Sequence, residues 1–156
     1  MKGNLNLLTK AAALLAIAIV FQLAKMGQYV TGIGINTVLI TAVGTCGLPW
    51  AAAIGFMTPV LAVLLGVQPP VTVVLVPFII VANILYAVIF RILKKYNDYL
   101  GVFAAALAKF MLLYAAANMI INKLPAPVKL AFSFPQLVTA LAGGMLAILI
   151  MKILKR

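Results

Sequence analysis

Residues 71–93 read VTVVLVPFIIVANILYAVIFRIL, and this stretch decides the class of fold. It contains no acidic residue, and its one basic residue, Arg91, lies close to its end. An α-helix needs about 20 predominantly apolar residues to cross the hydrocarbon core of a bilayer. The stretch therefore predicts a transmembrane helix.

The rest of the chain has the same character. Of its 156 residues 67% are hydrophobic and only 8% are charged, and the mean hydropathy is +1.26. A soluble domain of this length needs more polar surface to cover itself. The composition therefore predicts an integral membrane protein that remains in contact with the lipid bilayer.

Six apolar segments follow one another, and prolines recur in the short connections between them. The segments span residues 10–26, 33–48, 50–67, 71–93, 99–121 and 132–154. The first could be taken for a signal peptide, but FQLAKMG (21–27) is not a small-residue cleavage site. We therefore expect it to be retained, and residues 1–156 to form a single all-α domain of six transmembrane helices.

The basic residues predict the orientation. The net charge is +11, from 12 Lys+Arg and one acidic residue, and basic residues accumulate in cytoplasmic loops. If the N-terminus is inside, eight basic residues are inside: Lys2, Lys10, Arg91, Lys94, Lys95, Lys152, Lys155 and Arg156. Three are outside: Lys25, Lys123 and Lys129. The imbalance predicts cytoplasmic termini, and because it is explained by topology we expect no nucleic-acid partner.

Several kinds of chemistry are excluded by residues that the chain lacks. It has no histidine, one acidic residue, Asp98, and one cysteine, Cys46. An internal disulfide, a zinc cluster, haem ligation by histidine and a pair of carboxylates for acid–base catalysis therefore cannot form. We expect no metal, no cofactor and no enzymatic activity.

One lysine interrupts an apolar run. Lys109 lies in ALAKFMLLYAAANM (106–119). Counted at about 1.5 Å per residue from the inner helix ends, Lys109, Asn83 and the pair Gly143–Gly144 all lie near the bilayer midplane. The spacing predicts a cluster in which Lys109 lies near Asn83, with backbone exposed at the glycine pair. The cluster either is purely structural or serves function, as ionisable groups inside membranes usually do.

The state of Lys109 has three possible explanations. Burial disfavours the charged form, so the side chain is neutral in the first. In the second it is charged and held by Asn83 and by carbonyl groups near Gly143–Gly144. In the third a ligand brings the counter-charge, and this is our working hypothesis because the chain offers almost no acid.

A second polar set lies nearer the outside. Its members are Gln28, Tyr29 and Thr31 in the expected first outer loop, Asn36 early in the second helix, and Tyr114, Asn118, Gln136 and Thr139 in the fifth and sixth helices. They either line an outward-facing ligand cavity or lie among lipid headgroups. Lys109 and Tyr114 are about 140° apart around an ideal helix, so the two need not face one cavity.

Two small residues mark one face of the first helix. In KAAALLAIAIV (10–20), Ala12 and Ala16 are four positions apart and share a face. Small residues at this spacing allow another helix to approach closely in lipid. The face serves either a partner protein or packing inside the bundle.

The whole chain resembles a substrate-binding S component of an energy-coupling factor (ECF) vitamin transporter. The resemblance rests on six short-looped helices, on LTKAAALLAIAIVFQ (8–22), on GINTVLITAVGTCGLPWAAAIGFMTPVLAVLLG (34–66) and on SFPQLVTALAGGML (133–146). It implies a multi-pass protein of a prokaryotic cell membrane that captures a vitamin-like small molecule outside the cell. It also implies a transmembrane coupling subunit and two cytoplasmic ATPase subunits as partners.

The resemblance suggests roles for the alanine pair on the first helix and for the polar residues. Ala12 and Ala16 match the alanine motif that contacts the coupling subunit in this family. The family's ligand site lies in the outer half of the last three helices, under the first outer loop, which agrees with the outer polar set. Together with the Lys109 hypothesis, this predicts substrate contacts for Gln28, Tyr29, Asn36, Asn83, Lys109, Tyr114, Asn118, Gln136 and Thr139. A stand-alone secondary carrier or channel is the alternative, although no intramembrane acid is present for proton or sodium coupling.

Overall fold

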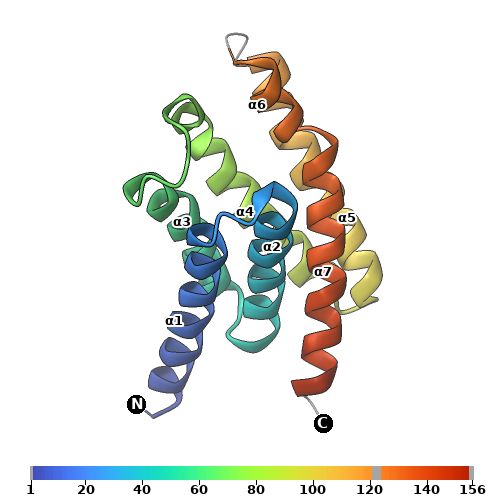
Figure 1. The fold of residues 1–156 in the computed structure, drawn as a ribbon. Coiled ribbons are helices and arrows are strands. Elements are labelled where there is room, and N and C mark those ends of the chain that lie inside the picture. Colours follow the sequence, from blue (N-terminus) through green and yellow to red (C-terminus); the bar gives the residue numbers. More distant parts are fainter. Residues whose placement is uncertain (1, 121–123, 155–156) are drawn as a thin grey trace.

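The computed structural model describes residues 2–120 and 124–154, and every regular element in these ranges is a helix (Figure 1). The elements are α1 (Lys2–Leu23), α2 (Gly27–Thr45), α3 (Leu48–Leu64), the 3₁₀ helix η1 (Pro70–Leu75), α4 (Val76–Leu93), α5 (Asp98–Ala115), the π-helical turn η2 (Ala116–Ile120), α6 (Ala126–Ala131) and α7 (Phe134–Leu154). The predicted all-α class is confirmed.

Four stretches of the described chain are long and apolar enough to cross a membrane. They are Leu5–Leu23, Pro70–Leu93, Asp98–Asn118 and Ala126–Leu154. α3 is also apolar but is shorter, at Leu48–Leu64. The fold is therefore that of a helical membrane protein, while six spans remain a prediction.

The helix boundaries differ from the predicted ones mainly on either side of the first connection. The first helix begins at Lys2, not near residue 10, and α2 begins at Gly27, so the segment expected to be an outer loop is helical. A short turn is possible because Lys25 (φ 49°) and Gly27 (φ 81°) both adopt left-handed backbone conformations. Gln28, Tyr29 and Thr31 therefore lie in the first turns of a helix.

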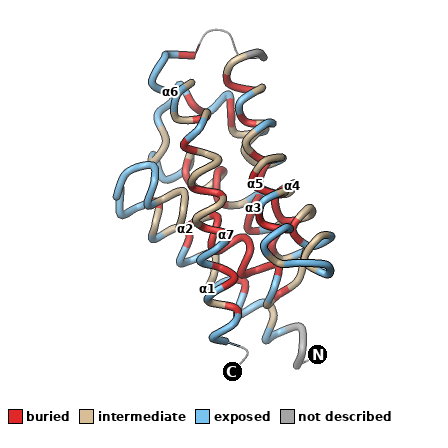
Figure 2. The backbone as a smooth tube through the Cα atoms, turned by 90° about the vertical axis from the view of Figure 1, so that its right-hand side faces the viewer, coloured by how far each residue is buried: buried red, intermediate tan, exposed pale blue. Residues whose placement is uncertain are grey.

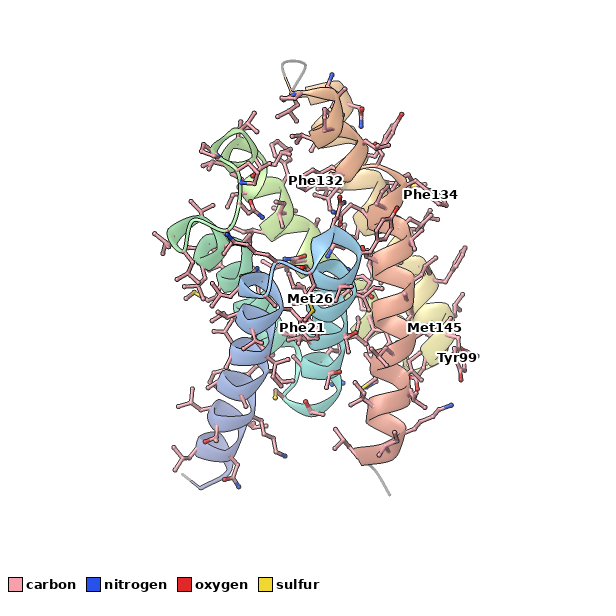
Figure 3. The ribbon with its side chains drawn as sticks, viewed as in Figure 1. Phe21, Met26, Tyr99, Phe132, Phe134 and Met145 are labelled. Atoms are coloured by element: carbon pink, nitrogen blue, oxygen red, sulfur yellow. The ribbon has the colours of Figure 1, made fainter. Side chains whose placement is uncertain are left out.

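The last predicted segment, residues 132–154, corresponds to α7. A short helix that was not predicted, α6, precedes it, and the two are joined at Phe132 and Ser133. Two aromatic residues at this corner have different surroundings: Phe132 is buried, whereas Phe134 is 64% exposed and points away from the bundle (Figure 3). Pro135 follows in the first turn of α7, a position where the missing N–H of proline costs no helical hydrogen bond.

The helices run alternately along the bundle, so that α1 begins and α7 ends at the same end (Figure 1). α2 is central, since it packs against α1, α3, α4 and α7. Buried residues follow the inner faces of these helices (Figure 2), and a core of small and aliphatic side chains fills the space between them. One end of the bundle carries the termini and the other carries α6, while the α1–α2 connection lies about midway between them (Figure 1).

Two adjacent glycines allow α7 to pack closely on both sides. A Cβ at Gly143 would lie 2.6 Å from the carbonyl oxygen of Ile33 on α2, and a Cβ at Gly144 would lie 2.4 Å from Val102 on α5. Thr37 donates a hydrogen bond to the Gly143 carbonyl at 3.1 Å. The glycine pair therefore acts as a packing surface against α2, α4 and α5, and the expectation that it leaves backbone exposed is wrong for Gly143.

We expect Gly143→Ala to destabilise the protein by about 1–3 kcal/mol, because its methyl group would contact the backbone of α2, which cannot move aside as a side chain can. Thermal unfolding in detergent would measure the loss. Gly44→Ala is the matched control, since the three atoms nearest to its methyl group all belong to the flexible Met151 side chain and the change favours helix formation. Equal unfolding temperatures for the two variants would contradict this account of α7 packing.

Candidate functional site

Lys109 is buried at the centre of the bundle, with 3% of its surface exposed. Its ammonium donates hydrogen bonds to Asn36 Oδ1 at 2.6 Å and to Asn83 Oδ1 at 2.7 Å. The lysine is on α5, Asn36 on α2 and Asn83 on α4, so one cation connects three helices. The predicted contact with Asn83 is present, and Asn36, expected in the outer polar set, is the second partner because it lies in the buried middle of α2.

A proline fixes the orientation of Asn83. Pro59 lies inside α3 and has no N–H, so the carbonyl of Gly55, four residues earlier, lacks its helical donor. Asn83 Nδ2 donates to this carbonyl at 3.1 Å, which turns Oδ1 of the same amide toward Lys109. Gly55 also permits the approach, because a Cβ there would lie 3.1 Å from Asn83 Cβ.

An aromatic ring completes the surroundings of the ammonium. Lys109 Nζ lies 5.2 Å from the centroid of the Tyr86 ring, within the range of cation–π attraction. The Tyr86 hydroxyl donates to the carbonyl of Ala140 on α7 at 2.6 Å. The residues around the lysine thus also connect α4 to α7.

No carboxylate faces Lys109 among the described residues. Asp98, the one acid of the chain, begins α5, about 16 Å away along the helix axis. An ammonium has three N–H donors, and the described residues provide two acceptors for it. Both acceptors are neutral amides, so they can solvate a charged Lys109 but do not compensate its charge.

A cavity of about 550 Å³ adjoins the cluster of Lys109, Asn36 and Asn83. It extends to the helix ends remote from the termini. Its volume falls in the ordinary range for small-molecule sites. Its polar or charged lining residues are Gln22, Lys25, Gln28, Thr31, Asn36, Thr58, Gln68, Thr72, Asn83, Lys109 and Gln136. Amides, hydroxyls and two lysines therefore surround the space, and its described wall contains no acid.

Five of the nine predicted substrate-binding residues line this cavity: Gln28, Asn36, Asn83, Lys109 and Gln136. Two of these five are also engaged at its rim. Gln28 Nε2 donates to the carbonyl of Ala131 at the end of α6, and Gln136 Nε2 donates to the same carbonyl at 3.4 Å. The two glutamines thus join the start of α2 to the corner between α6 and α7.

The other four predicted residues, Tyr29, Tyr114, Asn118 and Thr139, are not part of the cavity wall. Tyr29 is 53% exposed and Tyr114 is 39% exposed. Lys109 and Tyr114 are about 140° apart around the helix, which explains why Tyr114 does not line the cavity that Lys109 lines.

Asn118 and Thr139 have local partners instead. Asn118 Nδ2 donates to the Tyr114 carbonyl at 3.1 Å. Thr139 donates to the Gln136 carbonyl at 3.2 Å, and its side chain packs against Gly32. Depth in the membrane, which grouped these residues in the sequence, does not determine the face on which each one lies.

The sequence analysis missed five polar or charged lining residues, Gln22, Lys25, Thr58, Gln68 and Thr72. Of these, Gln22 and Thr58 are the most deeply buried. Gln22 is the last polar residue before the end of α1, and Thr58 directly precedes Pro59 in α3; the two are 4% and 1% exposed. Gln22 Nε2 donates to the Thr58 carbonyl at 3.0 Å. A polar side chain inside an apolar segment was the available signal, the same one that singled out Lys109.

Ala12 and Ala16 lie on the outer surface of α1. Packing inside the bundle is provided by Ala11 and Ala18, which are 4% and 0% exposed. The alternative that Ala12 and Ala16 pack internally is therefore wrong, and their face is open to lipid or to a partner.

No protein family, curated protein or solved structure matches the chain at a significant level.

We expect Asn36→Leu to lower the free energy of unfolding by about 1–3 kcal/mol, because the ammonium loses one of its two acceptors while it stays buried. Adding Lys109→Met should recover much of this loss, since a buried pair replaced on both sides by apolar groups costs little. Titration with sodium dodecyl sulfate would give the double-mutant cycle, with a coupling of at least about 1 kcal/mol. Additive losses would show that the two side chains do not depend on each other.

Proposed function

We propose that the protein is the membrane-embedded substrate-binding subunit of an ECF-type importer, with six spans and cytoplasmic termini in a prokaryotic cell membrane. It captures a vitamin-like small molecule outside the cell and delivers it through a transmembrane coupling subunit driven by two ATPase subunits. The observation that carries the proposal is the cavity of about 550 Å³ that ends at Lys109 and lies at the end of the bundle remote from the termini.

The ligand carries an anionic group that approaches Lys109. A buried ammonium with two neutral acceptors has unused capacity for a charge-assisted hydrogen bond, which is stronger than a bond between neutral groups. A charged side chain near the bilayer centre costs about 2.5–3.5 kcal/mol on insertion scales. A carboxylate on the ligand offsets this cost only when it is bound, so binding becomes selective for the ionised form.

A stand-alone secondary carrier or channel is the alternative. Carriers that couple transport to protons or sodium ions commonly use a carboxylate inside the membrane, and the cavity wall contains none among its described residues. A binding subunit that relies on separate ATPases needs no such group. Enzymatic catalysis has no support, because the cavity presents amides, hydroxyls and lysines without an acid or histidine.

Native mass spectrometry of the purified full-length protein tests the binding function. We expect wild-type protein to retain a small organic acid and Lys109→Met to retain at least tenfold less, a loss of about 1.4 kcal/mol in binding free energy. Methionine keeps the length of the side chain and removes the charge. Thermal unfolding of both proteins would show that the variant is folded. Equal retention by a folded Lys109→Met protein would limit this lysine to a structural role.

Variants on α1 can separate coupling to a partner protein from ligand binding. We expect Ala12→Trp or Ala16→Trp to abolish energised uptake in cells, because a bulky side chain prevents close helix approach, while purified protein still binds ligand. Ala53→Trp is the matched control, since Ala53 is also an exposed alanine but lies on α3. Normal uptake by both α1 variants would show that this face contacts only lipid.

A further inference from the structure

Two residues that line the cavity, Gln22 on α1 and Thr58 on α3, each have a side-chain oxygen without a partner. Gln22 Oε1 and Thr58 Oγ1 are both buried, and neither has a hydrogen-bond partner among the described residues. Both residues line the same cavity as Lys109. Leaving such a group unpaired costs about 1–3 kcal/mol. Two unpaired oxygens in the same part of the cavity therefore indicate that a ligand supplies their hydrogen-bond partner.

Other polar side chains of the cavity already have partners. Thr72 Oγ1 donates to the Pro69 carbonyl at 2.7 Å and lies 3.2 Å from Gln68 Oε1. Gln28 and Gln136 both donate to the Ala131 carbonyl. Among the described lining residues, the buried side-chain atoms without partners are therefore those of Gln22 and Thr58.

The chemistry of these two atoms selects their partner. An amide oxygen can only accept a hydrogen bond, and a threonine hydroxyl can accept one as well as donate. The partner at Gln22 must therefore be an N–H or O–H group. We refer to Gln22 and Thr58 as one pole of the cavity and to Lys109 as the other. The Lys109 ammonium donates hydrogen bonds and cannot accept them, so it requires an acceptor, most strongly an anion.

The helix α3 contributes to both poles. Its Gly55 carbonyl holds Asn83, which holds Lys109, and Thr58 is three residues further along the same helix. Gly55 and Thr58 are about 4.5 Å apart along the helix axis, so both poles depend on one turn of α3.

The remaining wall indicates an aliphatic ligand. Phe132 is the only aromatic residue among the described residues that line the cavity. A flat heteroaromatic ligand would find no pair of rings between which to stack, whereas Ile35, Ile79, Leu113 and Val128 offer aliphatic contacts.

We infer, on the basis of the proposed function, that the substrate is a compact aliphatic carboxylate bearing an N–H or O–H donor. Its carboxylate binds the Lys109 ammonium, and its donor binds Gln22 Oε1 and Thr58 Oγ1. The second pole gives selectivity among acids, because an acid without the donor leaves both buried atoms unpaired.

The test is isothermal titration calorimetry of the full-length protein in lipid nanodiscs. The probes are pantothenate and biotin as acids with N–H donors, their methyl esters, and heptanoate as an acid without a donor. We expect wild-type protein to bind at least one donor-bearing acid, at least tenfold more tightly than its ester and than heptanoate. Acids bound no better than their esters would overturn the inference.

Thr58→Val isolates the second pole. The change keeps the shape of the side chain and removes a hydroxyl that has no internal partner, so the unfolding temperature should stay equal or rise. Affinity for the donor-bearing acid should fall at least fivefold, while that for heptanoate should not change. Thr41→Val is the matched control, because Thr41 Oγ1 is also buried and unpaired but lines a separate apolar groove between α1, α2 and α7; its affinities should equal those of wild type.

Gln22→Met provides the second variant, with the same expected loss of selectivity for the donor. If Thr58→Val and Gln22→Met both bind the acids as wild type does, the inference is wrong and the binding function stands. If wild-type protein binds no member of the panel and retains no small molecule in native mass spectrometry, the proposed function fails together with the inference.

Discussion

A lysine ammonium that has no carboxylate partner is the constraint around which α2, α4 and α5 are arranged. Each of its two amide acceptors comes from a different helix, so Lys109 can remain solvated only while all three helices keep their positions. The tyrosine ring beside it extends this dependence to α7 through the Ala140 carbonyl. Breaking one contact leaves a buried charge with a single acceptor, which is costly in a medium of low dielectric constant.

An irregularity in α3 provides a free backbone carbonyl that a regular helix would not offer. In a continuous α-helix the Gly55 carbonyl would be occupied by its own chain, and Asn83 would have no fixed donor direction. Pro59 frees that carbonyl, Asn83 then binds it, and the same amide presents its oxygen to Lys109. A proline on α3 thereby determines the geometry of Lys109 on α5, and the helices that these contacts hold together contribute to the wall of the cavity.

The sequence predicted the helical class, the approximate segments and the contact between Lys109 and Asn83, because length, hydropathy and helical rise are local properties. It did not predict which face each polar residue occupies. Asn36 and Tyr114 had been grouped by depth, yet Asn36 is 1% exposed and binds Lys109, whereas Tyr114 faces outward. It also missed Gln22, a polar side chain inside an apolar segment, and only the structure reveals that its amide oxygen lacks a partner.

The scarcity of acids has an electrostatic consequence for the cavity. Lys25 and Lys109 both contribute to its wall, and no described lining residue opposes them. A low-dielectric cavity lined by one sign of charge raises the local concentration of the opposite sign and excludes the same sign. A single aspartate near Lys109 would satisfy the lysine permanently and remove this preference, since the ammonium would then need no ligand. Two asparagines solvate the cation without neutralising it, which keeps the helices together in the free protein and leaves the charge available to an anion.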